Sequence, residues 1–183
     1  MSWVSNLQPD LILCGPILSL SQDILQHYQI EGLVLDVDET LVPFKSSEAS
    51  GELMEWVAQI REVASIWLVS NNLSESRIGG IARSLNLPYL FGAAKPSRRK
   101  LKQAADAMNL PVERVAMVGD RLFTDVLAGN RLGMFTILVE PMLDPSNTDV
   151  FSPIRDFEVW VSQLLGVSLT GKQQNFIDRD KSL

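Results

Sequence analysis

Cysteine and histidine are nearly absent from this sequence of 183 residues. Cys14 is its one cysteine and His27 is its one histidine. A disulfide within the chain is therefore excluded, and so is a zinc site made of cysteine and histidine ligands from one chain. Any metal that this chain binds must use oxygen ligands.

Long apolar runs are also missing. No uninterrupted apolar segment approaches the roughly 18 residues that cross a bilayer, because Asp10, Gly15, Pro16 and Asp23 interrupt the apolar stretch near the N-terminus. No Lys or Arg precedes an apolar region at the start, so we expect no signal peptide. We therefore expect a protein that is neither secreted nor integral to a membrane, located in the cytoplasm or in the interior of an organelle.

Positive charge is scarce. The chain has 16 Lys and Arg against 22 Asp and Glu, a net charge of -6. Its summed field repels polyanions at long range, so we expect no nucleic-acid partner, and an anionic substrate must be attracted locally. The apolar fraction of 46% and the charged fraction of 21% are typical of a soluble globular protein. The length suits a single domain.

Short apolar runs alternate with helical patterns along most of the chain. Runs with the length of buried strands cover 33–35, 66–69, 115–118 and 135–139, and a weaker one covers 89–91. Apolar residues at helical spacing occupy 53–60, 78–85 and 101–108. This alternation predicts an α/β fold, a doubly wound parallel sheet with helices on both faces. Pro96 is expected in the first turn of the third helix, and Gly133 just after the end of the next.

The two ends of the chain have different patterns. We expect residues 1–30 to form a helical extension packed on the domain, and residues 31–166 to form the domain itself. Its last helix is predicted to begin at Pro153 and to end at Gly166. Residues 167–183 are mostly polar and are expected to form a mobile tail. The apolar stretch from Leu11 to Leu25 is expected to pack on the sheet, with peripheral membrane contact as the alternative.

Acidic residues directly follow two of the predicted strands. Asp36 and Asp38 come after the first strand, and Asp120 and Asp125 come after a later one. If the chain reverses direction after its third strand, the two acidic loops become neighbours in the crevice where such sheets bind ligands. Carboxylates gathered in one crevice repel one another and are tolerated mainly when a divalent cation neutralises them. Oxygen ligands without histidine or cysteine indicate magnesium.

The spacing of the first two aspartates permits a division of labour. Asp36 and Asp38 are two residues apart, so in an extended chain their side chains point to the same side while Val37 points away. One carboxylate can then attack phosphorus, while the second donates a proton to the leaving oxygen and later recovers it.

Two other loops offer groups that bind phosphate. Ser70, Asn71 and Asn72 end the second strand, where a hydroxyl, amides and backbone N–H groups can receive phosphate oxygens. Lys95 follows the short strand at 89–91, and its ammonium would balance Asp36 and the transferred phosphoryl group. The alternatives are a helix cap for Ser70 and a surface position for Lys95, and the role of Asn72 stays open.

These residues resemble the four motifs of the haloacid dehalogenase (HAD) superfamily. Asp36-Val37-Asp38-Glu39-Thr40 resembles the DxDxT signature of its phosphatases, Ser70 the second motif, Lys95 the third, and Gly119-Asp120 with Asp125 the fourth. The resemblance implies a HAD-like Rossmannoid fold of subclass III, with Asp36 as the nucleophile and Asp38 as the general acid/base. It also implies Mg²⁺ bound by the carboxylates of Asp36 and Asp120 and by the main-chain carbonyl of Asp38, with Thr40, Gly119 and Asp125 in support.

The segment from Leu7 to Pro141 further resembles the YqeG-like subfamily, which is similar to the mitochondrial-type phosphatidylglycerophosphatases. Too few residues separate Leu41 from the helix at Glu52, and Gly92 from Lys95, for a sizeable cap domain. An open crevice would admit a bulky substrate such as a lipid headgroup or a macromolecule. A basic cluster at 98–102 is either a solvated helix face or a local patch that steers a phosphorylated substrate.

The sequence therefore predicts a magnesium-dependent phosphomonoester phosphatase that acts through an aspartyl-phosphate intermediate. The resemblance favours phosphatidylglycerophosphate, a phospholipid, as the substrate. The alternatives are a protein or nucleotide phosphatase with the same residues, and a receiver-like signalling domain that accepts phosphate without rapid turnover. Asp38 argues against the receiver-like domain, because an acid/base at that position speeds hydrolysis of the acyl phosphate. The sequence does not indicate an oligomeric state.

Overall fold

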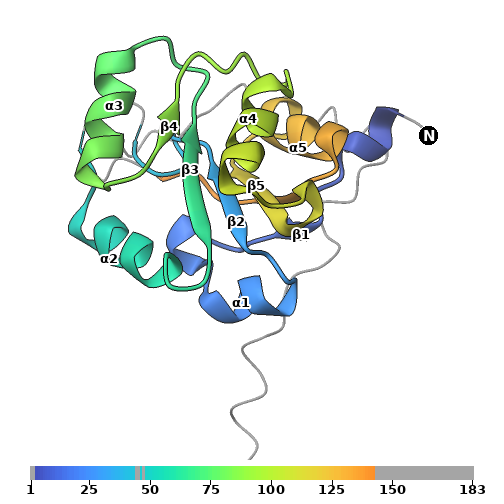
Figure 1. Cartoon of the computed structure of the whole chain (residues 1–183), viewed down its shortest axis with the longest axis horizontal. Helices are drawn as coiled ribbons and strands as arrows, with labels where there is room; N and C mark the ends of the chain where they lie inside the picture. The colour runs from blue at the N-terminus through green and yellow to red at the C-terminus, as the bar shows by residue number, and fades with distance from the viewer. Residues whose placement is uncertain (1–2, 44–45, 47, 143–183) are drawn as a thin grey trace, which may run out of the picture.

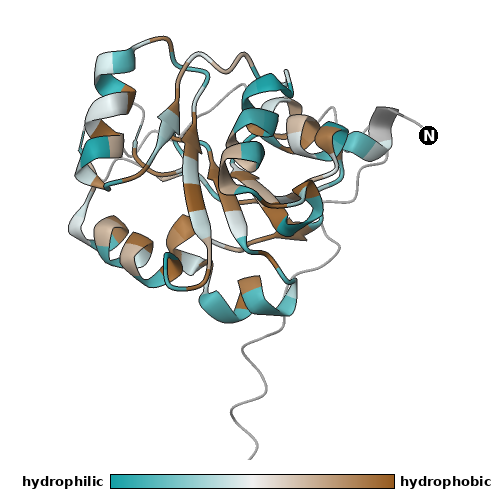
Figure 2. Cartoon of the chain, in the orientation of Figure 1, coloured by the Kyte–Doolittle hydropathy of each residue, from teal (hydrophilic) through white to brown (hydrophobic). Residues whose placement is uncertain are grey.

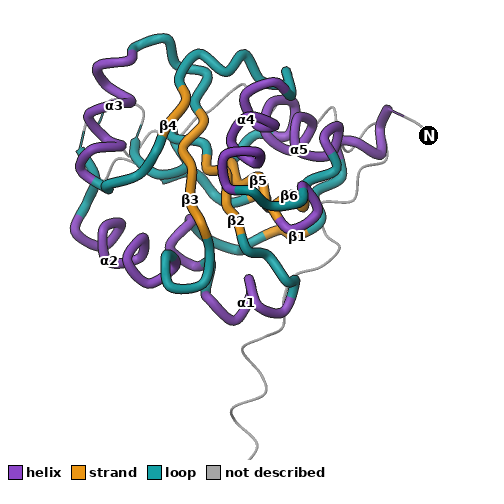
Figure 3. Tube along the Cα trace, in the orientation of Figure 1, coloured by secondary structure: helices purple, strands orange, loops and turns teal. Residues whose placement is uncertain are grey.

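The computed structural model describes residues 3–43, 46 and 48–142. Within them, six parallel strands form one sheet in the order β1-β6-β5-β2-β3-β4 (Figure 3). The strands are β1 Leu11–Ile12, β2 Gly32–Leu35, β3 Ser65–Val69, β4 Tyr89–Leu90, β5 Val115–Gly119 and β6 Phe135–Leu138. The chain builds outward from β2 through β3 to β4, then crosses back to β5 beside β2. This reversal is the one on which the predicted meeting of the two acidic loops depends.

The connections between strands are helical (Figure 1). The α-helices are α1 Gln22–His27, α2 Gly51–Ile60, α3 Glu75–Ser84, α4 Arg99–Met108 and α5 Leu127–Leu132. Shorter turns of 3₁₀ helix cover Trp3–Leu7, Ile17–Ser19 and Val112–Arg114, and a π-helical turn covers Leu122–Val126. The predicted doubly wound α/β fold is confirmed.

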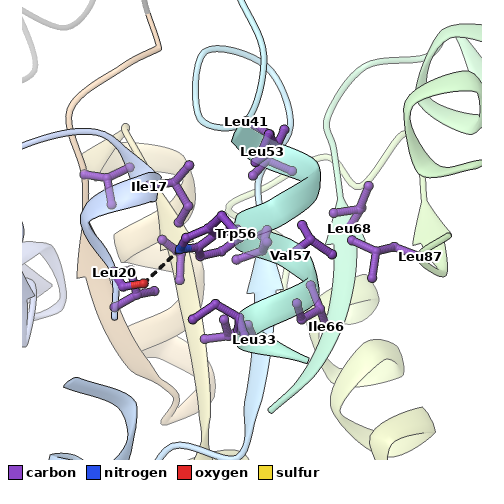
Figure 4. Close-up of a cluster of buried hydrophobic side chains, with 14 of the residues drawn as sticks. Ile17, Leu20, Leu33, Leu41, Leu53, Trp56, Val57, Ile66, Leu68 and Leu87 are labelled. Carbon is purple, nitrogen blue, oxygen red and sulfur yellow. Dashed lines mark hydrogen bonds between the residues drawn. The ribbon is translucent and has the colours of Figure 1, made fainter. Parts of the chain in front are cut away.

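Successive residues of β2 point to opposite faces of the sheet, and both faces are covered. Leu33 and Leu35 lie in one apolar cluster with Trp56 of α2 (Figure 4), whereas Val34 lies in a second cluster with Leu101 of α4. A strand buried on both sides has no polar face, which is why β2 is apolar throughout. Figure 2 shows the same division, with apolar residues in the central strands and hydrophilic residues along α4.

Side chains at the helix ends satisfy backbone groups that the helices leave free. The Ser50 hydroxyl accepts a hydrogen bond from the N–H of Leu53 at the start of α2, at 3.2 Å. Gly133 ends α5 with a φ of 84°, a conformation that glycine adopts without strain, so its predicted position is correct. The prediction for Pro96 is wrong, because α4 begins at Arg99. Pro96 lies in a preceding turn, which the N–H of Ser97 closes by donating to the carbonyl of Ala94 at 2.9 Å.

The N-terminal segment contributes more than the predicted helices. Besides α1 and two 3₁₀ turns, it contains β1, whose Leu11 pairs with Ile137 at the edge of the sheet. A two-residue strand has no periodicity to read, so the sequence does not reveal it. The indole of Trp56 donates to the carbonyl of Leu20 at 2.8 Å and holds this segment against α2 (Figure 4).

The predicted helix at 153–166 and the predicted tail at 167–183 lie outside the described residues. None of the helices in the part of the chain that the structure describes has both the length and the apolar character needed to cross a bilayer.

Candidate active site

The two acidic loops meet at the carboxyl ends of the strands. β2 and β5 are neighbours in register, with Leu35 opposite Val118. The N–H of Asp36 continues the pairing by donating to the carbonyl of Val118 at 2.9 Å. Asp36 and Asp120 therefore leave adjacent strands side by side, as the sequence predicts.

Three buried carboxylates converge there. Oxygen atoms of Asp36, Asp120 and Asp125 lie within 4.8 Å of one another, and none of the three residues is more than 7% exposed. Burial, together with the charges of Asp125 and Asp36, raises the pKa of Asp120 to about 8. Burial also raises the pKa of Asp36 to about 7, although the charge of Lys95 acts in the opposite direction. Such a cluster favours an added cation, and a set of carboxylate oxygens fits Mg²⁺.

Lys95 places its ammonium inside this cluster. Its Nζ lies 2.5 Å from Oδ1 of Asp36 and 2.7 Å from Oδ1 of Asp125, and it donates to the carbonyl of Val69 at 3.0 Å. Burial alone would lower the pKa of Lys95, but the charges of Asp125 and Asp36 outweigh it and raise that pKa above its ordinary value. The cluster thus contains one ammonium and three carboxylates, which leaves it net negative when all four groups are ionised.

The residues expected in support surround the same carboxylates. The hydroxyl of Thr40 donates to Oδ1 of Asp120 at 3.3 Å. The N–H of Arg121 donates to Oδ2 of Asp125 at 3.3 Å. A Cβ at Gly119 would overlap the carboxylate of Asp125, so only glycine lets that side chain lie against the end of β5. These contacts fix the directions of the two carboxylates that follow β5.

Asp38 lies at the mouth of the site and is held from three sides. Val37 is fully buried in the core while Asp38 is partly exposed, which agrees with the predicted alternation of the side chains. Oδ2 of Asp38 accepts from the Ser70 hydroxyl at 3.2 Å and from the Asn72 side-chain amide at 3.4 Å. Oδ1 of Asp38 forms an ion pair with Arg77 of α3.

In the loop after β3, the side chain of Ser70 binds Asp38 and the side chain of Asn71 binds the backbone of Lys95. The Ser70 hydroxyl accepts from the N–H of Asn72 at 3.0 Å while it donates to Asp38. The side chain of Asn71 is paired twice with the backbone of Lys95, accepting from its N–H at 2.7 Å and donating to its carbonyl at 3.2 Å. Asn71 thus anchors the loop that carries Lys95, a contact that the sequence does not reveal.

A cavity of about 290 Å³ opens in front of these groups. Its lining is polar and charged: Asp36, Asp38, Glu39, Asn71, Asn72, Lys95, Arg121 and Thr124. A larger hollow of about 670 Å³ lies at the opposite, amino ends of the strands, around Glu31, Arg61 and Pro88. It contains none of the predicted site residues. Of these two hollows, only the smaller one is lined by Asp36, Asp38 and Lys95.

Several residues of this site escape the sequence analysis. Arg77 contacts Asp38 and also donates to the backbone carbonyl of Ser46 at 3.0 Å, although an arginine on an amphipathic helix suggests only a solvated face. Glu39, Arg121 and Thr124 line the cavity. The available signal is proximity in sequence, since Glu39 lies inside the first acidic loop and the other two lie inside the second.

The chain is similar to several known proteins. A family model described as HAD-hydrolase-like matches residues 92–141. The chain is 35% identical over 127 residues to a Bacillus subtilis protein named "Probable phosphatase YqeG", covering 69% of this chain and 73% of that protein. It is 29% identical to the chloroplastic phosphatidylglycerophosphate phosphatase 1 of Chlamydomonas reinhardtii, covering 73% of this chain but only 53% of that protein.

Solved structures show the same fold at low sequence identity. A HAD family enzyme from Bacteroides thetaiotaomicron, solved as a magnesium complex, superposes with a TM-score of 0.51 at 10% identity, over 64% of this chain and 97% of that one. An uncharacterised protein from Listeria monocytogenes has a TM-score of 0.51 at 14% identity, over 75% of this chain and 100% of that one.

Proposed function

The chain belongs to the HAD-like phosphatases of the YqeG type, and from this membership we propose that it hydrolyses a phosphomonoester through an aspartyl-phosphate intermediate on Asp36, with Mg²⁺ as its cofactor. One observation carries the proposal. The carboxylates of Asp36, Asp120 and Asp125 converge, and the ammonium of Lys95 pairs with the first and the third of them. Asp36 and Lys95 line an open polar cavity. Buried carboxylates that converge are costly for stability, and the raised pKa values of Asp36 and Asp120 are typical of functional sites.

The carboxylates of Asp36 and Asp120 would hold Mg²⁺, together with the main-chain carbonyl of Asp38. Asp125 is paired with Lys95 and would support the cluster from behind. When bound, Mg²⁺ supplies positive charge that offsets the repulsion between the phosphate and the attacking carboxylate. The donor set supports this choice, because it offers oxygen atoms and neither sulfur nor imidazole.

Asp36 is the proposed nucleophile. The ammonium of Lys95 lowers the pKa of Asp36 against the effect of burial and so favours the ionised form, which the attack requires. One oxygen of Asp36 forms a bond to phosphorus while the ester oxygen leaves with its electron pair. Lys95 also faces the charge that gathers on the phosphoryl oxygens.

Asp38 is the proposed general acid and base. It protonates the leaving oxygen in the first step, and in the second it takes a proton from the water that attacks the phosphoryl group on Asp36. Arg77, Ser70 and Asn72 orient its carboxylate at the mouth of the cavity. The second step regenerates Asp36 and releases inorganic phosphate.

Phosphatidylglycerophosphate is the proposed substrate. Two relatives are named phosphatidylglycerophosphate phosphatase 1, from Chlamydomonas reinhardtii and Arabidopsis thaliana, and both names support the proposal for this chain. The size of the cavity supports it as well, because a volume of about 290 Å³ suits a phosphorylated headgroup while the acyl chains stay outside.

The test is phosphate release with Mg²⁺ from phosphatidylglycerophosphate, a nucleoside monophosphate and a phosphopeptide. The wild type should act on the lipid, and Asp36→Asn should have no activity, because an amide of similar shape is a poor nucleophile. Asp106→Asn, which changes an exposed aspartate of α4, is the matched control and should keep full activity. Turnover of the nucleotide or the peptide alone would reject the lipid substrate, and substantial activity of Asp36→Asn would reject the nucleophile.

The intermediate can be sought separately in Asp38→Asn. This variant should form and release the phosphoryl group slowly, so radioactive phosphate should stay on the protein and be released by hydroxylamine, as an acyl phosphate is. Label that resists hydroxylamine would contradict an aspartyl phosphate.

A further inference from the structure

Exposed cations gather beside the active site, at the start of α4. Arg98, Arg99, Lys102 and Arg131 line a surface hollow of about 680 Å³, which begins two residues after Lys95. All four are exposed, on a chain whose net charge is -6. Positive charge is thus concentrated on one surface of a protein that is negative overall.

Ion pairing within the protein does not explain this concentration. Arg98, Arg99 and Arg131 form no ion pair with a carboxylate among the residues that the structure describes; only Lys102 does, with Asp106. Arg98 and Arg99 lie at the start of α4, whose first turn contains no acidic residue, so they lie at the positive end of the helix dipole, where cations are unfavourable. Arg131 lies in the last turn of α5. The guanidinium groups of Arg98 and Arg131 donate to the backbone carbonyls of Arg131 and Pro96, at 2.9 and 3.1 Å, which holds them in place.

An exposed apolar side chain, Leu73, lies in the loop after β3, at the carboxyl ends of the strands. Leu73 is 82% exposed, the highest value among the large apolar residues that the structure describes. It adjoins Asn72, which lines the active-site cavity. Figure 1 shows its loop, between β3 and α3, at the same end of the sheet as the loop that leads into α4.

We propose that this surface, made of Leu73, Arg98, Arg99, Lys102 and Arg131, docks on an anionic phospholipid bilayer. The cations would bind lipid phosphates, which arginine matches with paired N–H groups. Leu73 would enter the apolar boundary below the headgroups. The remaining surface of the protein is repelled by the same membrane, so the charge distribution selects this orientation.

The chemistry favours a bilayer over other polyanions. A nucleic acid or an acidic protein could pair with the arginines, but neither requires a lone exposed leucine beside them. The inference rests on the proposed phosphatase function, because docking in this orientation presents the active-site cavity to phosphorylated headgroups. We call this surface the docking edge.

Co-sedimentation of the full chain with vesicles tests the docking edge. The protein should bind vesicles that contain phosphatidylglycerol, bind pure phosphatidylcholine vesicles much less, and bind less tightly as salt is added. Arg99→Gln should weaken binding about fivefold, the effect of one basic residue near an anionic surface. Arg61→Gln, which changes an exposed arginine at the opposite edge, is the matched control and should bind as the wild type does. Leu73→Ser should weaken binding that persists at high salt.

A second measurement separates docking from catalysis. Arg99→Gln and Leu73→Ser should hydrolyse a water-soluble phosphomonoester as the wild type does, yet be slower on substrate embedded in anionic vesicles. Equal binding to both kinds of vesicle, or equal effects of Arg99→Gln and Arg61→Gln, would overturn the docking edge. Tighter binding to duplex DNA or polyglutamate than to the anionic vesicles would overturn it as well. If no phosphomonoester is hydrolysed, the proposed function fails, while the vesicle assay still decides the docking edge.

Discussion

Replacing Lys95 with methionine removes the one ammonium from a cluster of three buried carboxylates. The side chain of Lys95 is 1% exposed and lies 2.5 Å from Asp36 and 2.7 Å from Asp125, so water cannot substitute for it. Breaking a buried ion pair by removing one partner costs about 3 to 5 kcal/mol, which for a protein of this size lowers Tm by about 6 to 20 °C. Methionine has a similar length and flexibility, so little of this loss comes from packing.

The loss should depend on pH in a direction that can be worked out. Burial raises the pKa of Asp36 to about 7 in the folded wild type, and Lys95 is the main influence that lowers it. A carboxyl group with a raised pKa contributes stability at low pH and loses that contribution as pH rises through its folded pKa. Without Lys95 the pKa of Asp36 rises further, so Lys95→Met should be closest to the wild type in acid and fall behind it as pH increases.

The assay is urea unfolding in the presence of a chelator, at pH values below and above 7. Lys102→Met is the matched control: it removes an exposed ammonium paired with Asp106 four residues along α4 and should cost only about 0.3 to 0.5 kcal/mol at either pH. The reasoning is refuted if Lys95→Met is no less stable than Lys102→Met, or if its deficit grows as the solution becomes more acidic.

Three other changes probe the same site. Arg77→Met should lower kcat roughly tenfold to a hundredfold with little effect on KM, because it frees the acid/base Asp38; Arg77→Lys should restore part of the rate, and unchanged steady-state kinetics would contradict the role. Gly119→Ala should destabilise the protein by about 1 to 3 kcal/mol, because its Cβ would overlap a buried carboxylate. At Gly51 an added Cβ meets nothing within 4 Å, so in thermal unfolding Gly51→Ala should not destabilise the protein, and equal effects at the two glycines would refute the overlap. Saturating Mg²⁺ should raise stability by about 2.7 kcal/mol at one hundred times its Kd. At a fixed Mg²⁺ concentration this gain should increase as pH rises toward 8, near the pKa of Asp120, and vanish in Asp120→Asn; calorimetry that finds equal gains in both proteins would reject this ligand.

Much of the fold can be predicted from local patterns. The apolar runs at 33–35 and 115–118 correspond to β2 and β5, and the helical spacing at 53–60 corresponds to α2. These patterns are reliable because a strand buried on both faces must be apolar and an amphipathic helix must repeat its apolar residues every turn. β1 and the turn at Pro96 were missed, since two residues carry no period and a proline marks a turn as readily as a helix start.

For the candidate site too, local patterns predict some features and not others. The aspartates of both acidic loops and Lys95 could be predicted, because polar residues placed directly after buried strands must lie at one edge of a parallel sheet. The partners of Asp38 and the pairing of Asn71 with the backbone of Lys95 could not be predicted. Their contacts join loops that are 24 to 39 residues apart in sequence, and no spacing rule relates such positions.

The sequence alone therefore determined which residue types follow which strands, and hence the chemistry available to this protein. Only the tertiary structure decided how those groups pair, with Lys95 between Asp36 and Asp125 and with Arg77 on Asp38. The physical reason is the distance in sequence over which each kind of information extends. Burial patterns repeat within one strand or helix, so neighbouring residues in the sequence suffice to reveal them. The strength of an ion pair depends on a separation of a few ångströms that arises only when distant segments pack together.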